Sequence, residues 1–285
     1  MTLPLGTNIS FKSGKWVLRE VFDTGGSSKI FLATSEENKI GVIKVHRPIM
    51  KGYPIPIRIR NEMKFKIKDH PHIIAPKENQ IVQFNETRVV CLLLEFFNYG
   101  ELSDFITKET PGKEGLKKRL MVVKSMASTV EHLHENGWIH GDISDRNFLL
   151  DCENHEVRLI DFETSIKNSA EKEGFVWARR EFLAPEVDEE GITALKKQSD
   201  IWSLGLLIIQ WVAPSIWQEL KKKEGWREIY NSRKSEGENK SDGSIILQDS
   251  PEGIEHIWEW LKKSLSIDWK ERPEVSDLLR CLEND

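Results

Sequence analysis

The sequence predicts an α+β protein with two lobes, a small strand-rich lobe followed by a larger helical lobe. Up to about residue 95, short β-rich runs alternate with turns made of Gly, Ser and Asn. From Gly100 onward, apolar residues recur at the spacing of a helix. The pattern changes only once. With 285 residues, the chain fits one two-lobed unit or two modest domains, with a first part at about 10–95, a connecting segment at about 95–101 and a second part at about 102–283.

The first lobe is expected to contain four strands and one short helix. The strands are predicted at residues 15–21, 29–34, 39–45 and 89–95. Three prolines between residues 48 and 56 exclude a helix there, because proline cannot donate a backbone hydrogen bond. A helix is then predicted over residues 57–68, and it should end before His70 because the residue that precedes a proline disfavours the helical conformation.

The second lobe is expected to contain four longer helices. They are predicted at residues 116–136, 199–212, 252–265 and 273–283. The first should end at Gly137, since glycine readily adopts the left-handed conformation that ends a helix. The second is apolar nearly all round, which is typical of a buried central helix. Residues 232–244 are polar and without periodicity, and we expect a loop there.

Composition excludes several classes of function. The net charge of −5 argues against binding to nucleic acid or to a membrane surface, which requires a clustered basic surface. No apolar run approaches the ~20 residues that a membrane span needs, and the N-terminus lacks the pattern of a signal segment. The three cysteines are odd in number and far apart, which indicates a reducing compartment. We expect an intracellular protein, cytoplasmic or else nuclear; the oligomeric state is not indicated.

Residues 138–162 carry most of the functional information. Asp142 stands five residues before Asn147, and Asp161 follows in Leu-Ile-Asp-Phe. Phosphoryl-transfer enzymes place a base and two metal ligands on such a loop–hairpin unit. Asp142 is therefore the candidate to accept the proton of the attacking hydroxyl. Asn147 and Asp161 are the candidates to hold Mg²⁺.

These residues resemble two motifs of the eukaryotic-type protein kinase family, the His-Arg-Asp catalytic loop and Asp-Phe-Gly. Further family motifs follow in order, namely Ala-Pro-Glu at 184–186, Asp-x-Trp-Ser-x-Gly at 200–205 and Arg-Pro at 272–273. The resemblance covers about residues 15 to 282, which leaves almost no room for a second domain, so it implies a single protein kinase domain over residues 1–285. It implies a two-lobed kinase fold, dependence on ATP and Mg²⁺, and a protein substrate with a hydroxyl acceptor. It also implies a buried Glu186–Arg272 pair and hydrogen bonds from the catalytic-loop backbone to Asp200.

The sequence Gly-Val-Ile-Lys-Val at 41–45 resembles the third-strand motif whose lysine pairs with the α- and β-phosphates. The resemblance implies this role for Lys44. Glu62, in the predicted short helix, is the only acidic residue between Glu37 and Asp69. It is therefore the well-placed partner to hold Lys44.

The resemblance also implies an ATP site at the connecting segment. Backbone groups of Glu95 and Phe97 would bond the adenine, Leu94 would border the pocket behind it, and Glu101 would reach the ribose. The apolar residues expected to sandwich the adenine ring are Ile30, Val42 and Leu149. In the loop that covers the phosphates, only the middle glycine of the family pattern, Gly25, stands in place.

Several residues depart from the family pattern around the catalytic motifs. Gly141 replaces an arginine that receives an activation-loop phosphate in many kinases, so we do not expect phosphorylation of Thr164, Ser165 or Ser169 to be obligatory. Ser144 replaces a lysine usual in Ser/Thr kinases, and Arg146 is the candidate to compensate. These two departures concern the regulation of the site and the type of acceptor.

Two further departures concern the metal motif and the short helix. Glu163 replaces glycine and should stiffen the turn after Asp161. Lys66 stands where the family has an apolar contact to Phe162, and Phe65 would make that contact if the helix register differs by one.

Two alternatives to a protein kinase remain. The His-Gly-Asp motif resembles aminoglycoside and choline phosphotransferases, but these enzymes generally lack the three later motifs. A non-catalytic scaffold would account for the eroded glycine loop, but it has no chemical need for the full set of catalytic residues. We favour a protein acceptor, with Ser/Thr preferred over Tyr.

The segment 176–186 is the predicted platform for an extended peptide. Trp177, Arg179 and Arg180 could contact a substrate there, and two arginines would favour acidic residues around the acceptor. Alternatively, the arginines bind acidic residues of this chain, such as Glu171 or Glu173.

Overall fold

The computed structural model describes residues 3–24, 27–67, 70–84, 86–106, 112–174, 176, 178–222, 247 and 249–283. They form two compact units, and each is described by itself. The first unit contains residues 1–68, 74–98 and 161–163, and the second contains residues 69–73, 99–160 and 164–285. The change at residues 98–99 falls in the predicted connecting segment. The assignment of 161–163 to the first unit was not predicted from the sequence pattern.

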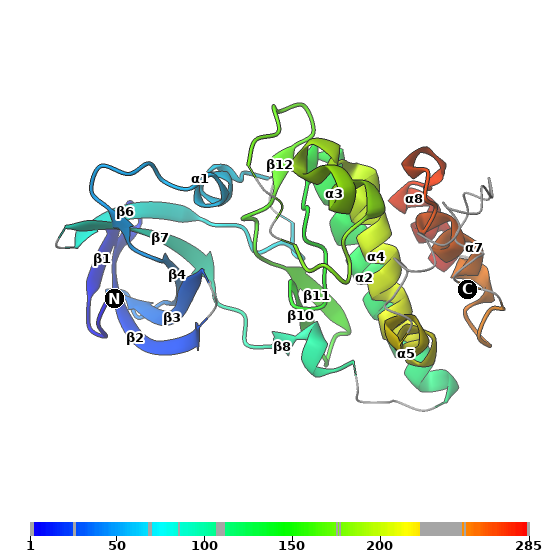
Figure 1. Ribbon diagram of the computed structural model, residues 1–285. Coiled ribbons are helices and arrows are strands. Elements are labelled where there is room, and N and C mark those ends of the chain that lie inside the picture. Colours follow the sequence, from blue (N-terminus) through cyan, green and yellow to red (C-terminus); the bar gives the residue numbers. More distant parts are fainter. Residues whose placement is uncertain are drawn as a thin grey trace. The chain divides into compact units, whose positions relative to one another are not determined.

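The first unit is an antiparallel sheet of seven strands with one helix (Figure 1). The strands are β1 (Asn8–Phe11), β2 (Gly14–Thr24), β3 (Ser28–Ser35), β4 (Ile40–His46), β5 (Ile49–Met50), β6 (Glu78–Phe84) and β7 (Thr87–Glu95). Their order is β1-β2-β3-β4-β7-β5, and β6 also pairs with β7. The four predicted strands correspond to β2, β3, β4 and β7. Strands β1, β5 and β6 were not predicted from the sequence; in β6, polar and exposed residues dominate.

The two faces of this sheet have different roles. One face forms an apolar core of Leu3, Ile9, Phe11, Trp16, Leu18, Phe31, Ala33, Ile43, Val45, Val89, Cys91 and Leu93. Residues that pair directly across strands share a face, as do residues two apart on one strand. Ile30 pairs with Lys44, and Val42 pairs with Leu94. These four residues therefore lie together on the face opposite the core.

The helix of the first unit, α1 (Ile57–Lys64), is shorter than predicted. It ends at Lys64 because Phe65 is extended, with φ −59° and ψ 119°. Ile59 anchors α1 in a second apolar cluster with Ile49, Val90 and Leu92. The buried residues of α1 are Ile59 and Glu62, three positions apart on one side of the helix. Packing of Ile59 therefore determines where Glu62 points.

The second unit is mainly helical (Figure 1). Its helices are α2 (Lys113–Glu135), α3 (Pro185–Glu190), α4 (Lys197–Val212), α5 (Pro214–Lys222), α7 (Glu255–Ser264) and α8 (Val275–Glu283). Strands β8 (Gly100–Glu101), β10 (Phe148–Asp151) and β11 (Glu156–Leu159) form one small sheet, and β9 (Trp138–Ile139) pairs with β12 (Ile166–Lys167). The four predicted helices correspond to α2, α4, α7 and α8. The loop predicted at 232–244 lies outside the described residues.

Helix α4 is the central helix of the second unit. Every residue from Ser199 to Trp211 is buried, as its apolar sequence predicts. Gly205 allows α7 to approach closely, since a Cβ there would lie 2.1 Å from Oγ of Ser264. After α2, Gly137 has φ +72°, which confirms the predicted glycine stop. These helices carry the loops that are described below.

No single described helix is long and apolar enough to cross a membrane. Helices α4 and α5 together meet the length and composition criteria, but they are bent by 118° at their junction.

Candidate active site

Lys44 lies at the centre of a buried cluster of charges in the first unit. Its Nζ atom is 2.8 Å from Oε1 of Glu62 and 2.9 Å from Oδ1 of Asp161. The predicted pairing of Lys44 with Glu62 is therefore present. Burial by itself lowers the pKa of Lys44, but the charges of Asp161, Glu62 and Glu163 outweigh burial and hold the pKa above its usual value. Lys44 is consequently a fixed cation at neutral pH.

The segment 161–163 brings two acidic residues and one aromatic residue to this cluster. Asp161 has φ +63°, a left-handed conformation that aspartate tolerates better than most residues. Phe162 is fully buried and stacks on Phe65, with ring centroids 3.8 Å apart and an interplanar angle of 12°. Such a pair adds about 0.5–1.5 kcal/mol beyond burial. Phe65 therefore makes the contact to Phe162, as the one-residue register difference predicts, and Lys66 is exposed.

Glu163 does more than the predicted stiffening of the turn. Its buried carboxylate lies 3.0 Å from Nζ of Lys44 and accepts a 3.1 Å hydrogen bond from Oγ of Ser27. Two further nitrogen-bearing side chains lie slightly farther away, with Nε of Arg58 at 3.7 Å and Nδ1 of His46 at 3.8 Å. Glu163 thus connects the segment after Asp161 to β4, to α1 and to the residue before β3.

The sequence analysis missed His46, which is buried two residues after Lys44 on β4. Its Nε2 atom lies 3.2 Å from Oε2 of Glu62. The period of two along a strand places Val42, Lys44 and His46 on one face. His46 could have been predicted as a neighbour of Lys44, because it is a polar residue two positions farther along the same strand.

In the second unit, Asp142 and Asn147 lie side by side on the loop after β9. The Asn147 amide donates to the backbone oxygen of Asp142 at 2.7 Å and to its Oδ2 at 2.8 Å. The other carboxylate oxygen of Asp142 accepts from the backbone N–H of Arg179 at 3.1 Å. Both carboxylate oxygens of Asp142 are thus held by hydrogen bonds. In Asn147, the amide oxygen is the atom that could bind a metal ion.

Asp200 fixes the backbone of this loop from the first turn of α4. Its two carboxylate oxygens accept hydrogen bonds of 2.8 Å from the backbone N–H groups of His140 and Gly141. Nε2 of His134 lies 2.9 Å from Oδ2 of the same buried carboxylate. The predicted bond from the loop backbone to Asp200 is confirmed.

The backbone conformation at position 141 requires a glycine. It has φ +78°, and a Cβ there would lie 2.8 Å from Cγ2 of Thr164 and 3.0 Å from Cδ2 of Leu195. The family's arginine could not stand here without strain. Thr164 and Ser165 are buried, and Ser165 donates to the His140 carbonyl at 3.2 Å. The conformation therefore explains the missing arginine, and two of the three candidate hydroxyls are inaccessible.

Arg179 is bound by acidic residues of its own chain. Its guanidinium pairs with the buried Asp145 and, at 2.6 Å, with Oε2 of Glu181. These partners differ from Glu171 and Glu173, which the sequence analysis suggested. The Arg180 side chain is 79% exposed, and its Nε lies 3.9 Å from Asp188. Of the two arginines, Arg180 is therefore the one placed to meet another molecule; Trp177 lies outside the described residues.

Asp145 was also missed. Its carboxylate accepts from Nε2 of Gln210 at 3.0 Å as well as from Arg179, and its backbone oxygen accepts from Ser103 at 3.1 Å. Ser144, next to it, is fully buried. A lysine at that position would have to be buried too, whereas Arg146 is exposed. Asp145 thus ties the catalytic loop to the segment that holds Arg179.

The residues predicted to hold the nucleotide are divided between the two units. Ile30, Val42 and Leu94 share a sheet face with Lys44 and are half-buried, while Glu95 is exposed and Phe97 is half-buried. In the second unit, Leu149 on β10 pairs with Glu101 on β8. Gly25 lies outside the described residues. Their roles in binding ATP stay predictions.

The donor set of the predicted metal ligands fits Mg²⁺. Asp161 offers a carboxylate and Asn147 an amide oxygen, the hard donors that Mg²⁺ prefers. The Asp161 side chain is 40% exposed, so water can complete the coordination. The two residues belong to different units.

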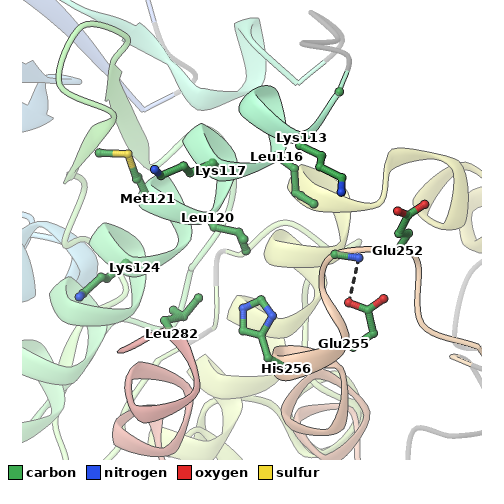
Figure 2. Close-up of a pocket in the computed structure, with 12 residues that line it drawn as sticks. Lys113, Leu116, Lys117, Leu120, Met121, Lys124, Glu252, Glu255, His256 and Leu282 are labelled. Carbon is green, nitrogen blue, oxygen red and sulfur yellow. Dashed lines mark hydrogen bonds between the residues drawn. The ribbon is translucent and has the colours of Figure 1, made fainter. Parts of the chain in front are cut away.

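A separate groove of about 1060 Å³ lies in the second unit. Figure 2 shows its wall on α2, with Leu116, Leu120 and Lys117, opposite His256 and Glu255 at the start of α7. The groove is lined by none of the residues predicted to bind nucleotide, metal or acceptor. We therefore do not assign the chemistry to it.

A family model described as the protein kinase domain matches residues 17–281. The chain belongs to the protein kinase family. It is 29% identical over 167 residues to the liver/testis catalytic gamma chain of mouse phosphorylase b kinase (55% of this chain, 39% of the relative). It is 27% identical over 206 residues to a probable serine/threonine-protein kinase of Dictyostelium discoideum (70% and 43%).

A third relative is the chicken inhibitor of nuclear factor kappa-B kinase subunit alpha, 23% identical over 285 residues (91% and 36%). The chain spans well under half the length of each of these three relatives. The family accounts for the two-lobed fold class that the sequence predicts.

Proposed function

We propose that this protein transfers the γ-phosphoryl group of ATP, in the presence of Mg²⁺, to a serine or threonine hydroxyl of a protein. The observation that carries the proposal is the contact of the buried Lys44 with the buried Glu62 and with the partly exposed Asp161. Lys44 is held within 2.9 Å of both carboxylates, so its ammonium is positioned before any nucleotide arrives. Positioning and electrostatic stabilisation supply most of the catalysis in phosphoryl transfer.

Each site residue has one role in this proposal. Lys44, oriented by Glu62, pairs with the α- and β-phosphates. Asp161 and Asn147 hold Mg²⁺, which would offset the negative charge on the transferring group when bound. Asp142 orients the acceptor hydroxyl and accepts its proton. The hydrogen bonds from Asn147 and Arg179 to its carboxylate support a fixed orientation for Asp142.

A protein acceptor is supported by the structure after residue 176. Glu186 and Arg272 anchor the end of that segment, and Arg179 connects it to the catalytic loop through Asp145. A small alcohol would need no such anchored platform. One of the three relatives described above, from Dictyostelium discoideum, is named a probable serine/threonine-protein kinase, and we extend the Ser/Thr preference to this chain on that basis. We also propose an intracellular location, cytoplasmic or else nuclear, because the few and widely spaced cysteines are typical of a reducing compartment.

The test is transfer of label from ATP to an acceptor, with Mg²⁺ present. Generic protein acceptors, choline, an aminoglycoside and the protein alone are compared, each with the wild type and with Asp142→Asn. We expect label on Ser or Thr of a protein acceptor, and loss of most of that label in the variant. Label only on choline or the aminoglycoside would replace the proposal with a small-alcohol phosphotransferase. Absence of transfer together with absence of nucleotide binding would favour the scaffold.

A further inference from the structure

Glu163 stands where the family has glycine, and it places a third carboxylate against Lys44. We propose that Glu163 competes with the nucleotide phosphates for Lys44, and that Arg58, with the polar ring of His46 beside it, takes over the Glu163 charge when nucleotide binds. The inference rests on the proposed function, because it assigns to Glu163 the control of ATP affinity at the same site.

The competition follows from the contacts of one ammonium group. Nζ of Lys44 lies 2.8 Å from Glu62, 2.9 Å from Asp161 and 3.0 Å from Glu163. Lys44 donates hydrogen bonds to Glu62 and Asp161, and Glu163 lies at ion-pair distance on the same ammonium group. A phosphate oxygen that binds Lys44 therefore meets the negative charge of Glu163 and must displace it from Lys44.

Glu163 is the carboxylate best placed to leave. Glu62 is fixed by the packing of α1 and is buried, and Asp161 is the predicted metal ligand. Besides Lys44, Glu163 has the guanidinium of Arg58 at 3.7 Å and the ring of His46 at 3.8 Å. Both distances exceed a hydrogen bond, so a small rotation of the carboxylate would shorten them while lengthening the 3.0 Å contact to Lys44.

The charge count explains why the alternative partners are needed. Three carboxylates, of Glu62, Asp161 and Glu163, face two permanent cations, Lys44 and Arg58. A buried carboxylate that loses its partner is strongly destabilising. If the phosphates displaced Glu163 from Lys44 and no other cation replaced Lys44, the free energy of ATP binding would include the cost of an unpaired buried carboxylate. This cost is reduced by Arg58, which lies beside Glu163, and by His46, which lies between Glu163 and Glu62.

The experiment measures the affinity for a non-hydrolysable ATP analogue with Mg²⁺ by calorimetry. Glu163→Gln keeps the size of the side chain and can keep the bond to Ser27, but it removes the charge that competes for Lys44. We expect the analogue to bind at least about fivefold more tightly, within the usual range for coupled sites. The KM for ATP should fall while kcat does not rise in proportion, a division that mere loss of structure would not produce.

Arg58 supplies the second half of the test. Arg58→Gln removes the alternative partner of Glu163, and we expect roughly fivefold weaker binding of the analogue. In the Glu163→Gln background, the same Arg58 change should have little effect, because no carboxylate then needs a new partner. This non-additivity is the signature of the exchange. The matched control is Glu36→Gln, the same chemical change at a side chain of the first unit that is 66% exposed, and it should leave the affinity unchanged.

The possible results separate this inference from the proposed function. Unchanged or weaker binding in Glu163→Gln, with wild-type phosphoryl transfer intact, would overturn the exchange and leave the kinase proposal standing. Additive effects of the Glu163 and Arg58 changes would also overturn it. A wild type that binds no analogue would overturn both. Should Glu163→Gln not fold, Glu163→Asp provides the same test, since the shorter side chain withdraws the charge from Lys44 and tighter binding is again expected.

Discussion

Arg272 and Glu186 form a buried, bidentate ion pair in the second unit. Nη1 and Nη2 of the arginine each lie 2.8 Å from one carboxylate oxygen, and the arginine side chain is fully buried. Arg272 also donates to the backbone oxygens of Gln198 and Ser266 at 2.8 and 2.9 Å. The pair that the family motifs imply is therefore present, 86 residues apart in sequence. It ties the loop before α8 to the start of α3 and α4.

Removal of this arginine should destabilise the protein strongly. Arg272→Ala leaves the Glu186 carboxylate without its arginine partner and the backbone oxygens of Gln198 and Ser266 without the donor they have here, at a cost of about 3–5 kcal/mol. Thermal unfolding measures the loss. The control is Arg280→Ala, which breaks an exposed i,i+3 pair with Asp277 and should cost under about 1 kcal/mol. Equal, small effects of the two changes would contradict the structural role of the pair.

The same pair predicts a dependence of stability on acid. Burial by itself raises the pKa of Glu186, but the hydrogen bonds and charge of Arg272 outweigh burial and lower the pKa below its usual value of 4.5. The unfolded state therefore takes up the proton first as the pH falls. The contribution of Glu186 should be complete above about pH 4.5 and should be lost as the pH falls from there through the lower folded-state value. In Glu186→Gln, denaturant unfolding should show lower stability at neutral pH and a shallower decline in acid; an unchanged slope would contradict this assignment.

The protein should be active without phosphorylation of the segment after Asp161. Gly141 cannot be the arginine that reads a phosphate, and Thr164 and Ser165 are buried. Phosphatase-treated protein should retain transfer activity, and Ser169→Ala should lose less than about tenfold, which is ~1.4 kcal/mol of barrier. Mass spectrometry of the treated protein verifies that it carries no phosphate. A loss of several orders of magnitude after treatment would show that another basic residue reads a phosphate.

Substrate preference should depend on Arg180 and not on Arg179. Arg180 is exposed, whereas Arg179 is paired with Asp145 and Glu181. On a peptide array, Arg180→Ala should reduce any preference for acidic residues around the acceptor. Arg179→Ala should instead lower the melting temperature and the overall rate, with the order of preferred peptides kept. If the preference follows Arg179, or if no acidic preference exists in the wild type, this assignment is wrong.

Much of the fold could be predicted from the spacing of apolar residues and from Gly and Pro residues that end helices and strands. The α4 helix was evident because its residues are apolar on all sides, and α2 because Gly137 ends it. Strand β6 was not evident because its polar residues face solvent, and its pairing with β7 depends on a contact between strands. The early end of α1 at Lys64 was also missed, since its position depends on where Phe65 can stack on Phe162.

The same distinction applies to the candidate site, where some residues could be predicted from the sequence and others could not. Lys44, Glu62, Asp142, Asn147 and Asp161 stand in motifs whose spacing is visible in the sequence. The partners of Glu163 are not visible, because Ser27, His46 and Arg58 come from separate elements that only the fold brings together. The need for glycine at 141 likewise depends on Thr164 and Leu195, distant in sequence. Motifs in the sequence identify the candidate site residues, and packing determines which other residues hold them in place.

The central claim is most directly tested by phosphoryl transfer in Asp161→Asn. The side chain is 40% exposed and adds little to the core, so the variant should fold with nearly the wild-type melting temperature. The change removes the charge needed to hold Mg²⁺, and we predict that transfer from ATP to a protein acceptor falls to background. Turnover equal to that of the wild type, in a variant shown to be folded, would contradict the kinase account.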